Sequence, residues 1–210
     1  MENTHESVYS RHVVEFVAVA NEFCKYAEHA GEIRGAELLT IFQRFLPLLY
    51  LKATFLPKLE PVFEDGNEKF VTEFDWYRIH DSFLKKLGST DDYLKLPDEV
   101  QEKNEGPVPG SLSEDFADIY QDMKNFTLLY QTGTEEVMND AIWECRMNFD
   151  DFWGKKLLNA MRAVHVYLSS EEKPDDMDIS GDQDDTGREN RIITELQKEY
   201  HKKGGGNISQ

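Results

Sequence analysis

Four residues of the chain have types and spacings that could hold a divalent metal ion. His80 and Asp81 are adjacent, and Asp118 and Asp122 lie four residues apart, about one turn of a helix. Helical phosphohydrolases place a histidine, a His-Asp pair and a later aspartate around such an ion. Neighbouring residues of a helix point about 100° apart, so His80 and Asp81 converge on one ion only in a special geometry. A divalent-metal-dependent phosphohydrolase is therefore the alternative interpretation rather than the leading one.

A second group of polar side chains could form a pocket at one end of a helical bundle. Arg162 and His165 lie late in the last predicted helix, which also carries Trp153. In an antiparallel bundle, a late-helix arginine can meet an early-helix acid such as Asp118 or Asp122. One interpretation is a structural ion pair beside a histidine with satisfied hydrogen bonds. The sharper hypothesis is a polar pocket for a partner or a small ligand, formed by Asp118, Asp122, Trp153, Arg162 and His165.

Three carboxylates share one face of a predicted helix. Asp115, Asp118 and Asp122 recur at i, i+3 and i+7, opposite the apolar side that carries Phe116 and Met123. In a chain with a net charge of −18, this pattern is typical of a solvated acidic stripe. We therefore expect these three side chains to face water.

Other catalytic patterns are missing from the sequence. Cys24 and Cys145 both lie on apolar stripes, where a thiol usually packs and stays inert. Two cysteines make neither a disulfide framework nor a zinc site. The sequence contains no nucleophile elbow, no phosphate-binding loop and no dinucleotide-binding glycine pattern. No catalytic residue and no cofactor is predicted.

The elements that position these residues are helices. Apolar side chains recur at i, i+3, i+4 and i+7 in five segments, and no segment predicts a convincing strand. Short connections between such helices indicate an all-α fold, an antiparallel helical bundle of about five helices. The predicted helices cover about residues 8–29, 36–56, 72–87, 111–130 and 134–168.

Several residues mark where these helices begin, bend or weaken. Thr72 and Ser111 each begin a capping-box spacing, and Thr134 is a third predicted cap. Pro47 predicts a kink or a restart in the second helix. Gly154 predicts a local weakness or a close helix crossing in the last helix. The polar residues between the third and fourth helices predict a long loop.

The charge of the chain excludes some partners and favours others. The 210 residues include 23 Lys and Arg and 41 Asp and Glu, with a pI near 4.7. Unaided binding to nucleic acid or to an anionic membrane requires clustered cations, so neither is expected. A hydrophobic fraction of 40% with 12% aromatic residues is sufficient for a core. An acidic surface favours a basic protein partner.

The acid is concentrated after the helical body of residues 1–170. Residues 171–187 contain eight acids and one base and show no apolar period, which predicts a disordered acidic linker. Residues 188–210 are predicted to form a short basic helix followed by a flexible tail. Whether that basic helix docks on the body stays open, as does the oligomeric state.

No segment has the pattern of a targeting or membrane sequence. The first residues, MENTHESVYSRH, lack the basic and apolar regions of a secretory signal. No apolar run approaches the length that crosses a bilayer, and no lipidation motif occurs. We expect a soluble cytoplasmic protein without membrane attachment.

Three stretches together resemble the DUF5063 family, a bacterial domain of unknown function that is common in the Bacteroidetes. They are FLPLLYLKATFLP at 45–57, SLSEDFADIYQDMKNFTLLYQ at 111–131 and ECRMNFDDFWGKKLLNAMRAVH at 144–165. The resemblance covers residues 8–168. It implies an α-helical cytoplasmic domain, brings no catalytic residues, and suggests by gene association a link to RNA processing.

The leading functional hypothesis is a non-catalytic interaction or adaptor protein that binds a basic protein partner. The alternative, a phosphohydrolase of HD-like type, would use His80, Asp81, Asp118 and Asp122. A bound divalent ion would favour the alternative.

Overall fold

The helices predicted from the apolar periodicity are present in the structure, a computed structural model that describes residues 7–64, 66–95 and 107–170. The predicted acidic linker at 171–187 and the predicted basic segment at 188–210 lie outside the described residues. The α-helices of the described part are α2 (Arg11–Glu28), α3 (Gly35–Thr54), α4 (Glu73–Leu87), α5 (Leu112–Gln131), α6 (Glu135–Asn148) and α7 (Gly154–Ser169). A π-helical turn, Phe149–Trp153, joins α6 to α7, so five helical segments form the bundle, as predicted. No helix in these ranges is both long and apolar enough to span a membrane.

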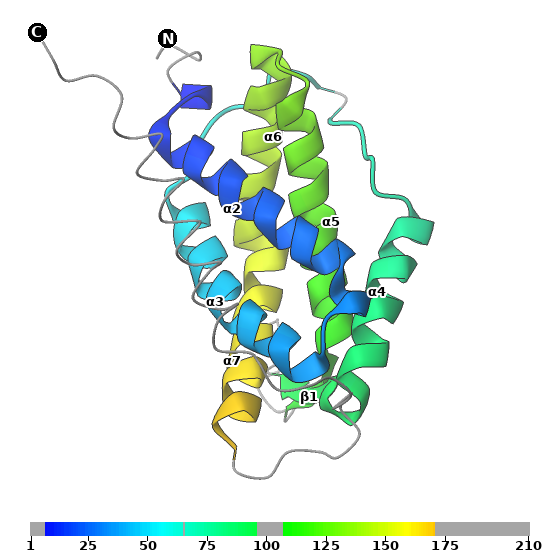
Figure 1. The fold of residues 1–210 in the computed structure, drawn as a ribbon. Coiled ribbons are helices and arrows are strands. Elements are labelled where there is room, and N and C mark those ends of the chain that lie inside the picture. Colours follow the sequence, from blue (N-terminus) through cyan, green and yellow to red (C-terminus); the bar gives the residue numbers. More distant parts are fainter. Residues whose placement is uncertain (1–6, 65, 96–106, 171–210) are drawn as a thin grey trace, which may run out of the picture. The chain divides into compact units, whose positions relative to one another are not determined.

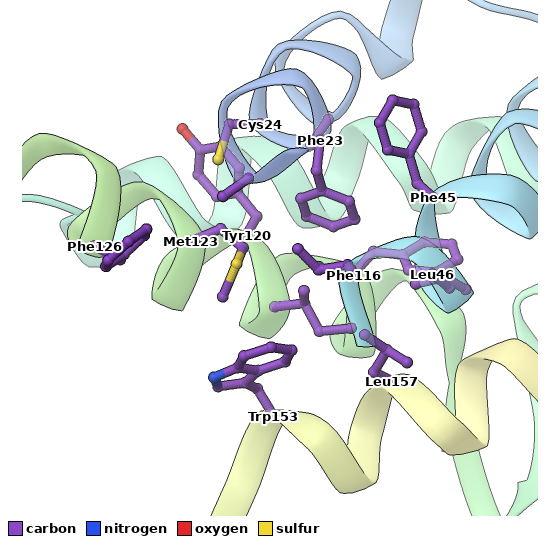
Figure 2. Packing of buried hydrophobic residues seen from close by; sticks show 14 of the residues in the cluster. Phe23, Cys24, Phe45, Leu46, Phe116, Tyr120, Met123, Phe126, Trp153 and Leu157 are labelled. Carbon is purple, nitrogen blue, oxygen red and sulfur yellow. The ribbon is translucent and has the colours of Figure 1, made fainter. Parts of the chain in front are cut away.

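Helix α5 is the centre of the bundle and packs against α2, α4, α6 and α7 (Figure 1). Its side chains are buried on more than one face, because helices cover it on several sides. Figure 2 shows Phe116, Tyr120 and Met123 of α5 between α2 and α7, with Trp153 below them. The ring of Phe116 lies 4.6 Å from that of Phe42 in α3, between ring centroids. This aromatic core fixes the helices whose polar residues form the site described below.

The helix starts follow the predicted capping chemistry in two of three cases. The Thr72 hydroxyl accepts from the Asp75 amide at 3.2 Å, and the Asp75 carboxylate accepts from the Thr72 amide at 3.1 Å, a complete capping box. The Ser111 hydroxyl accepts from the Glu114 amide at 3.2 Å. Thr134 precedes α6 but its side chain makes no cap hydrogen bond, so that prediction is wrong. Pro47 lies within α3, which continues through it.

Gly154, where the sequence predicts a weakness or a close helix crossing, directly follows a π-helical turn. A Cβ atom at this position would lie 2.3 Å from the carbonyl oxygen of Phe149, which is too close for any side chain. Glycine therefore allows the wide turn, which adds a residue to the helical path between α6 and α7. The predicted single helix over 134–168 is two α-helices of different phase.

The prediction of a bundle without strands is wrong at one place. Two short strands, β1 (Asp92–Lys95) and β2 (Val108–Ser111), pair antiparallel within the predicted loop. Buried Asp91 holds this hairpin to α5, because its carboxylate accepts from the Ser113 amide and the Ser111 hydroxyl, both at 2.7 Å. The strands were missed because β2 contains Pro109, and a strand of four residues gives almost no period.

Candidate functional site

A row of polar side chains runs along α5 inside the bundle. Asp115, Asp118, Asp122 and Asn125 lie at i, i+3, i+7 and i+10, and they face α4, α6, α7 and the chain that leads into α4. Asp115 is only 2% exposed, and the other three are buried or half-buried. The predicted solvated stripe is therefore wrong. This face of α5 looks exposed in the sequence, but the surrounding elements cover it. We call the buried polar row of Asp115, Asp118, Asp122 and Asn125 the seam.

Lys156 of α7 neutralises one end of this seam. Its ammonium lies 2.7 Å from the Asp118 carboxylate and 3.7 Å from that of Asp115. The Tyr93 hydroxyl of β1 donates to Asp115, and the Trp76 indole of α4 donates to Asp118 at 2.7 Å. Five side chains from β1, α4, α5 and α7 thus form one connected network. The network joins the ends of these elements and leaves Asp118 fully engaged.

Burial shifts the protonation equilibria along the seam. It raises the pKa of Asp115 and of Asp122 to about 6 each, against hydrogen bonds from Tyr93 and Asn148 that lower them. Burial lowers the pKa of Lys156, but the carboxylates of Asp118 and Asp115 outweigh it, so its pKa is raised overall. The lysine is therefore held as a cation, and it offsets part of the acidic charge enclosed in the bundle.

The four residues predicted as metal ligands are not brought together around one point. His80 contacts its neighbour Asp81 at 3.0 Å, and its ring stacks on Trp76 with 5.0 Å between centroids. Asp118 is engaged by Lys156 and Trp76, and Asp122 accepts from Asn148 at 2.8 Å. In residues 7–64, 66–95 and 107–170, no group of three or more His, Cys, Asp or Glu side chains is arranged to hold a metal ion.

The predicted polar pocket of Asp118, Asp122, Trp153, Arg162 and His165 also does not form as a unit. Trp153 is fully buried in the core and donates to the Cys145 carbonyl at 3.1 Å. Arg162 is exposed and donates to the Leu94 carbonyl at 3.3 Å, and His165 is exposed on α7. Lys156 lies about two turns nearer the start of α7 than Arg162, and it is the cation that meets the α5 acids.

The long connection between α3 and α4, residues 55–72, is held by buried polar side chains. We call this connection the strap. Asp140 of α6 accepts from the amides of Val62 at 2.7 Å and Phe63 at 2.8 Å. Asn125 of α5 accepts from the amides of Phe70 at 2.8 Å and Val71 at 3.0 Å. Two buried side chains thus each bind two consecutive backbone amides and fix the strap at residues 62–63 and 70–71.

The two anchors lie at a similar height in the bundle. Asn125 lies about two turns before α5 ends, and Asp140 lies about one and a half turns after α6 begins. Because α5 and α6 are consecutive and pack against each other, these positions face the same level of the α5–α6 pair. The two anchored parts of the strap, residues 62–63 and 70–71, therefore lie against α6 and α5 at a similar level.

A small recess lies between the strap and the α5–α6 pair. Its volume is about 10 Å³, room for about one water molecule, and typical small-molecule sites are far larger. Glu144 binds the strap here, through an ion pair with Lys69 and a hydrogen bond from Asn67 at 3.0 Å. The Cys145 thiol lines the recess, but burial raises its pKa well above the ordinary range, so it remains a thiol. The recess suits the anchoring of the strap better than the binding of a substrate.

The outer side of the strap combines apolar and acidic side chains. Val62, Phe63 and Phe70 are large apolar residues that remain exposed although the strap backbone is fixed. Glu60, Glu64 and Glu68 are exposed between and beside them. We call these six residues the strap surface. Lys58 and Lys69 are also exposed in the strap, and Lys69 is paired with Glu144, so the acidic side chains are in excess. Exposed apolar groups on a fixed backbone beside an excess of one charge are typical of a binding surface for a protein of the opposite charge.

Sequence reasoning did not identify the anchors of the strap. Asn125 and Asp140 occupy positions beside the apolar stripes of their helices, next to Phe126 and Ala141. A buried amide or carboxylate requires hydrogen-bond partners, and the connection between the second and third predicted helices was the nearest source of free backbone amides. Polar residues at stripe positions opposite a long connection were therefore the signal that could have located this site.

Comparisons with known proteins agree with the resemblance predicted from the sequence. No curated protein matches the chain. The crystal structure of protein BF1032 from Bacteroides fragilis is 36% identical, with a TM-score of 0.70, and the match covers 80% of this chain and 98% of that one. The model of DUF5063, a domain of unknown function, matches residues 7–170, against the predicted 8–168. The chain therefore belongs to the DUF5063 family.

Proposed function

We propose that this protein is a cytoplasmic, non-catalytic interaction or adaptor protein, and that the strap surface binds a basic protein partner. The observation that carries the proposal is the fixed strap. Asp140 and Asn125 hold it by four hydrogen bonds to backbone amides, while Val62, Phe63 and Phe70 remain exposed. A side chain that stabilised only the fold would be expected to turn inward.

Rigidity makes such a surface effective in binding. A loop that is ordered before binding loses less conformational entropy when a partner arrives. Buried anchors on α5 and α6 connect the strap to the most central helix of the bundle. The exposed phenylalanines therefore reach the partner in a fixed arrangement, which favours a specific interaction over adhesion to any apolar surface.

Charge defines the class of partner. The strap surface carries Glu60, Glu64 and Glu68, and the whole chain has a net charge of −18. The negative electrostatic field of such a surface accelerates association with a basic protein and repels acidic proteins. Salt screens this field. A protein that itself binds RNA has a basic surface of this kind, which agrees with the link to RNA processing suggested by the family resemblance.

Affinity capture from the native host tests the proposal. The bait is the full chain, compared with the variant Phe63→Ser/Phe70→Ser, and captured proteins are identified and then purified for titration. A matched control, Val14→Ser/Leu158→Ser, changes two exposed apolar residues on α2 and α7. We expect a basic protein bound by wild type and control, at least 10-fold weaker binding by the strap variant, and weaker binding as salt increases.

Two results would contradict the proposal. One is a purified partner that binds the strap variant as tightly as wild type. The other is the absence of any salt-sensitive basic partner when the bait is folded, as shown by an unchanged melting temperature. A glutamine variant, Glu60→Gln/Glu64→Gln/Glu68→Gln, separates the two parts of the surface. It should lower the association rate and the salt dependence and leave the dissociation rate nearly unchanged.

A further inference from the structure

The outward side of α4 carries large apolar residues that no other element covers in the described part of the chain. Phe74 is 76% exposed, Tyr77 is 59% exposed and Leu84 is 41% exposed. They lie at i, i+3 and i+10, with exposed Asp81 at i+7, so they form one line along the helix. Figure 1 shows α4 at the margin of the bundle, beside α5.

This line is separate from the side that attaches α4 to the body. Ile79, Phe83 and Leu87 are fully buried and pack α4 into the core. A helix of a monomer with one buried face normally has a polar outer face. Helix α4 therefore has two apolar sides, and only the inner one is used within the chain.

The outer side of α4 has a two-fold pattern centred on Ile79. Phe74 and Leu84 lie five residues before and after this centre, and Glu73 and Lys85 lie six residues before and after it. If two copies of α4 pair antiparallel about an axis at Ile79, residues equally far from the centre come to the same height. Phe74 of each copy then lies level with Leu84 of the other, and Glu73 lies level with Lys85.

We propose that the protein forms a two-fold symmetric dimer in which α4 packs antiparallel on α4 of a second copy. The partner is a second copy because the face complements itself in charge as well as in apolar pattern. Glu73 is exposed at the start of α4 and Lys85 near its end, so antiparallel pairing places each acid at the end of the partner helix that carries the base. Parallel pairing would place like charges at the same height.

Two further features favour the antiparallel arrangement. Arg78 lies on the flank of the outer line and Asp81 lies in it, one residue before and two residues after the centre, so antiparallel pairing brings Arg78 of each copy to nearly the height of Asp81 of the other. The dipoles of two antiparallel helices also oppose each other, which is favourable. One helix from each copy gives an interface at the low end of the size range, on the order of 1,000 Å², so we expect a dissociation constant near the micromolar range.

The experiment is sedimentation of the full-length chain over concentrations from about 1 µM to about 1 mM. We expect a concentration-dependent dimer whose dissociation constant rises at least 10-fold in Phe74→Ser. The matched control, Leu158→Ser, changes an exposed leucine of α7 that has 42% exposure, similar to Leu84, and should leave the dimer unchanged. Melting temperatures of both variants show that they are folded.

Charge exchange tests the orientation. Glu73→Lys alone and Lys85→Glu alone each place like charges at the same height, so both should weaken the dimer. The double variant Glu73→Lys/Lys85→Glu restores opposite charges and should recover most of the affinity. A chain that is monomeric at all concentrations overturns the proposal. A dimer insensitive to Phe74→Ser, or one that the double charge exchange does not rescue, overturns the antiparallel α4 interface.

Discussion

Replacing Asp140 by alanine isolates the contribution of the strap anchor. The change removes the acceptor of three hydrogen bonds, from the amides of Val62 and Phe63 at 2.7 and 2.8 Å and from the side chain of Asn139 at 3.0 Å. The two bonds to the strap decide the estimate. Hydrogen bonds to a charged group contribute about 1.5–3 kcal/mol each. Val62 and Phe63 lie in the exposed strap, so their freed amides can bind water, which favours the lower value. The expected loss in the free energy of unfolding is therefore about 3 kcal/mol.

Chemical denaturation and hydrogen exchange measure this loss at two levels. A chain of this size loses about 2–4 °C in melting temperature per kcal/mol, so Asp140→Ala should melt roughly 6–12 °C lower. The amides of Val62 and Phe63 should lose protection, while those in the middle of α5 keep theirs. Asp140→Asn retains one carbonyl acceptor and should show an intermediate loss.

The control is Asp150→Ala, which removes an exposed carboxylate paired with Arg146 at 3.2 Å within one helical segment. Such a pair contributes about 0.3–0.5 kcal/mol, so the control should be nearly silent. The anchor argument fails if Asp140→Ala costs no more than this control. It also fails if Val62 and Phe63 exchange at the wild-type rate in the variant, because their amides then do not depend on the carboxylate.

Three further predictions concern the seam and the π turn. The pKa of Asp122 is raised to about 6, so the folded state binds its proton more tightly than the unfolded chain, and stability should fall as pH rises from about 4 to 7. Asp122→Asn should remove this share of the pH dependence and raise stability at pH 7 by up to about 3 kcal/mol, and an unchanged denaturation profile would contradict the burial argument. Lys156→Met should lower stability by about 2 kcal/mol, because it leaves the carboxylate of Asp118 without its cation, and a neutral effect in thermal melting would show that solvent screens this pair. Gly154→Ala should cost about 2 kcal/mol or more, because the new methyl group meets the Phe149 oxygen, whereas in an ordinary helix interior alanine would stabilise by about 1 kcal/mol.

The fold could largely be predicted from the sequence because its signals are local. A helix of 15–20 residues repeats its apolar pattern several times, and the capping box at Thr72 and Asp75 depends on residues only three apart. The β1–β2 pair could not be predicted in this way. Its two strands have four residues each and are stabilised by one another and by Asp91, which no local pattern reports.

The site depended on contacts between distant residues. Asp115 is buried because α7 and β1 cover it, and these elements lie near Asp115 only in the folded chain. Arg162 and Lys156 are both cations on α7. Which of them meets the carboxylates of α5 depends on how far α7 extends past the start of α5. The anchor at Asp140 contacts residues 77 and 78 positions away in the sequence. Spacing along one helix contains no information about such pairs.

The π turn at Phe149–Trp153 has a consequence for how this sequence can vary in length. A π turn is one residue longer than the α-helical turn it replaces, so it acts as a single-residue insertion that sets the angular phase of everything after it. Deleting one residue there would restore a continuous α-helix but rotate α7 by about 100°. Leu157 would leave the core and Lys156 would turn away from Asp118. A deletion in this turn therefore changes the register of the whole last helix. Only an inserted residue between Asn148 and Lys156 could compensate for it.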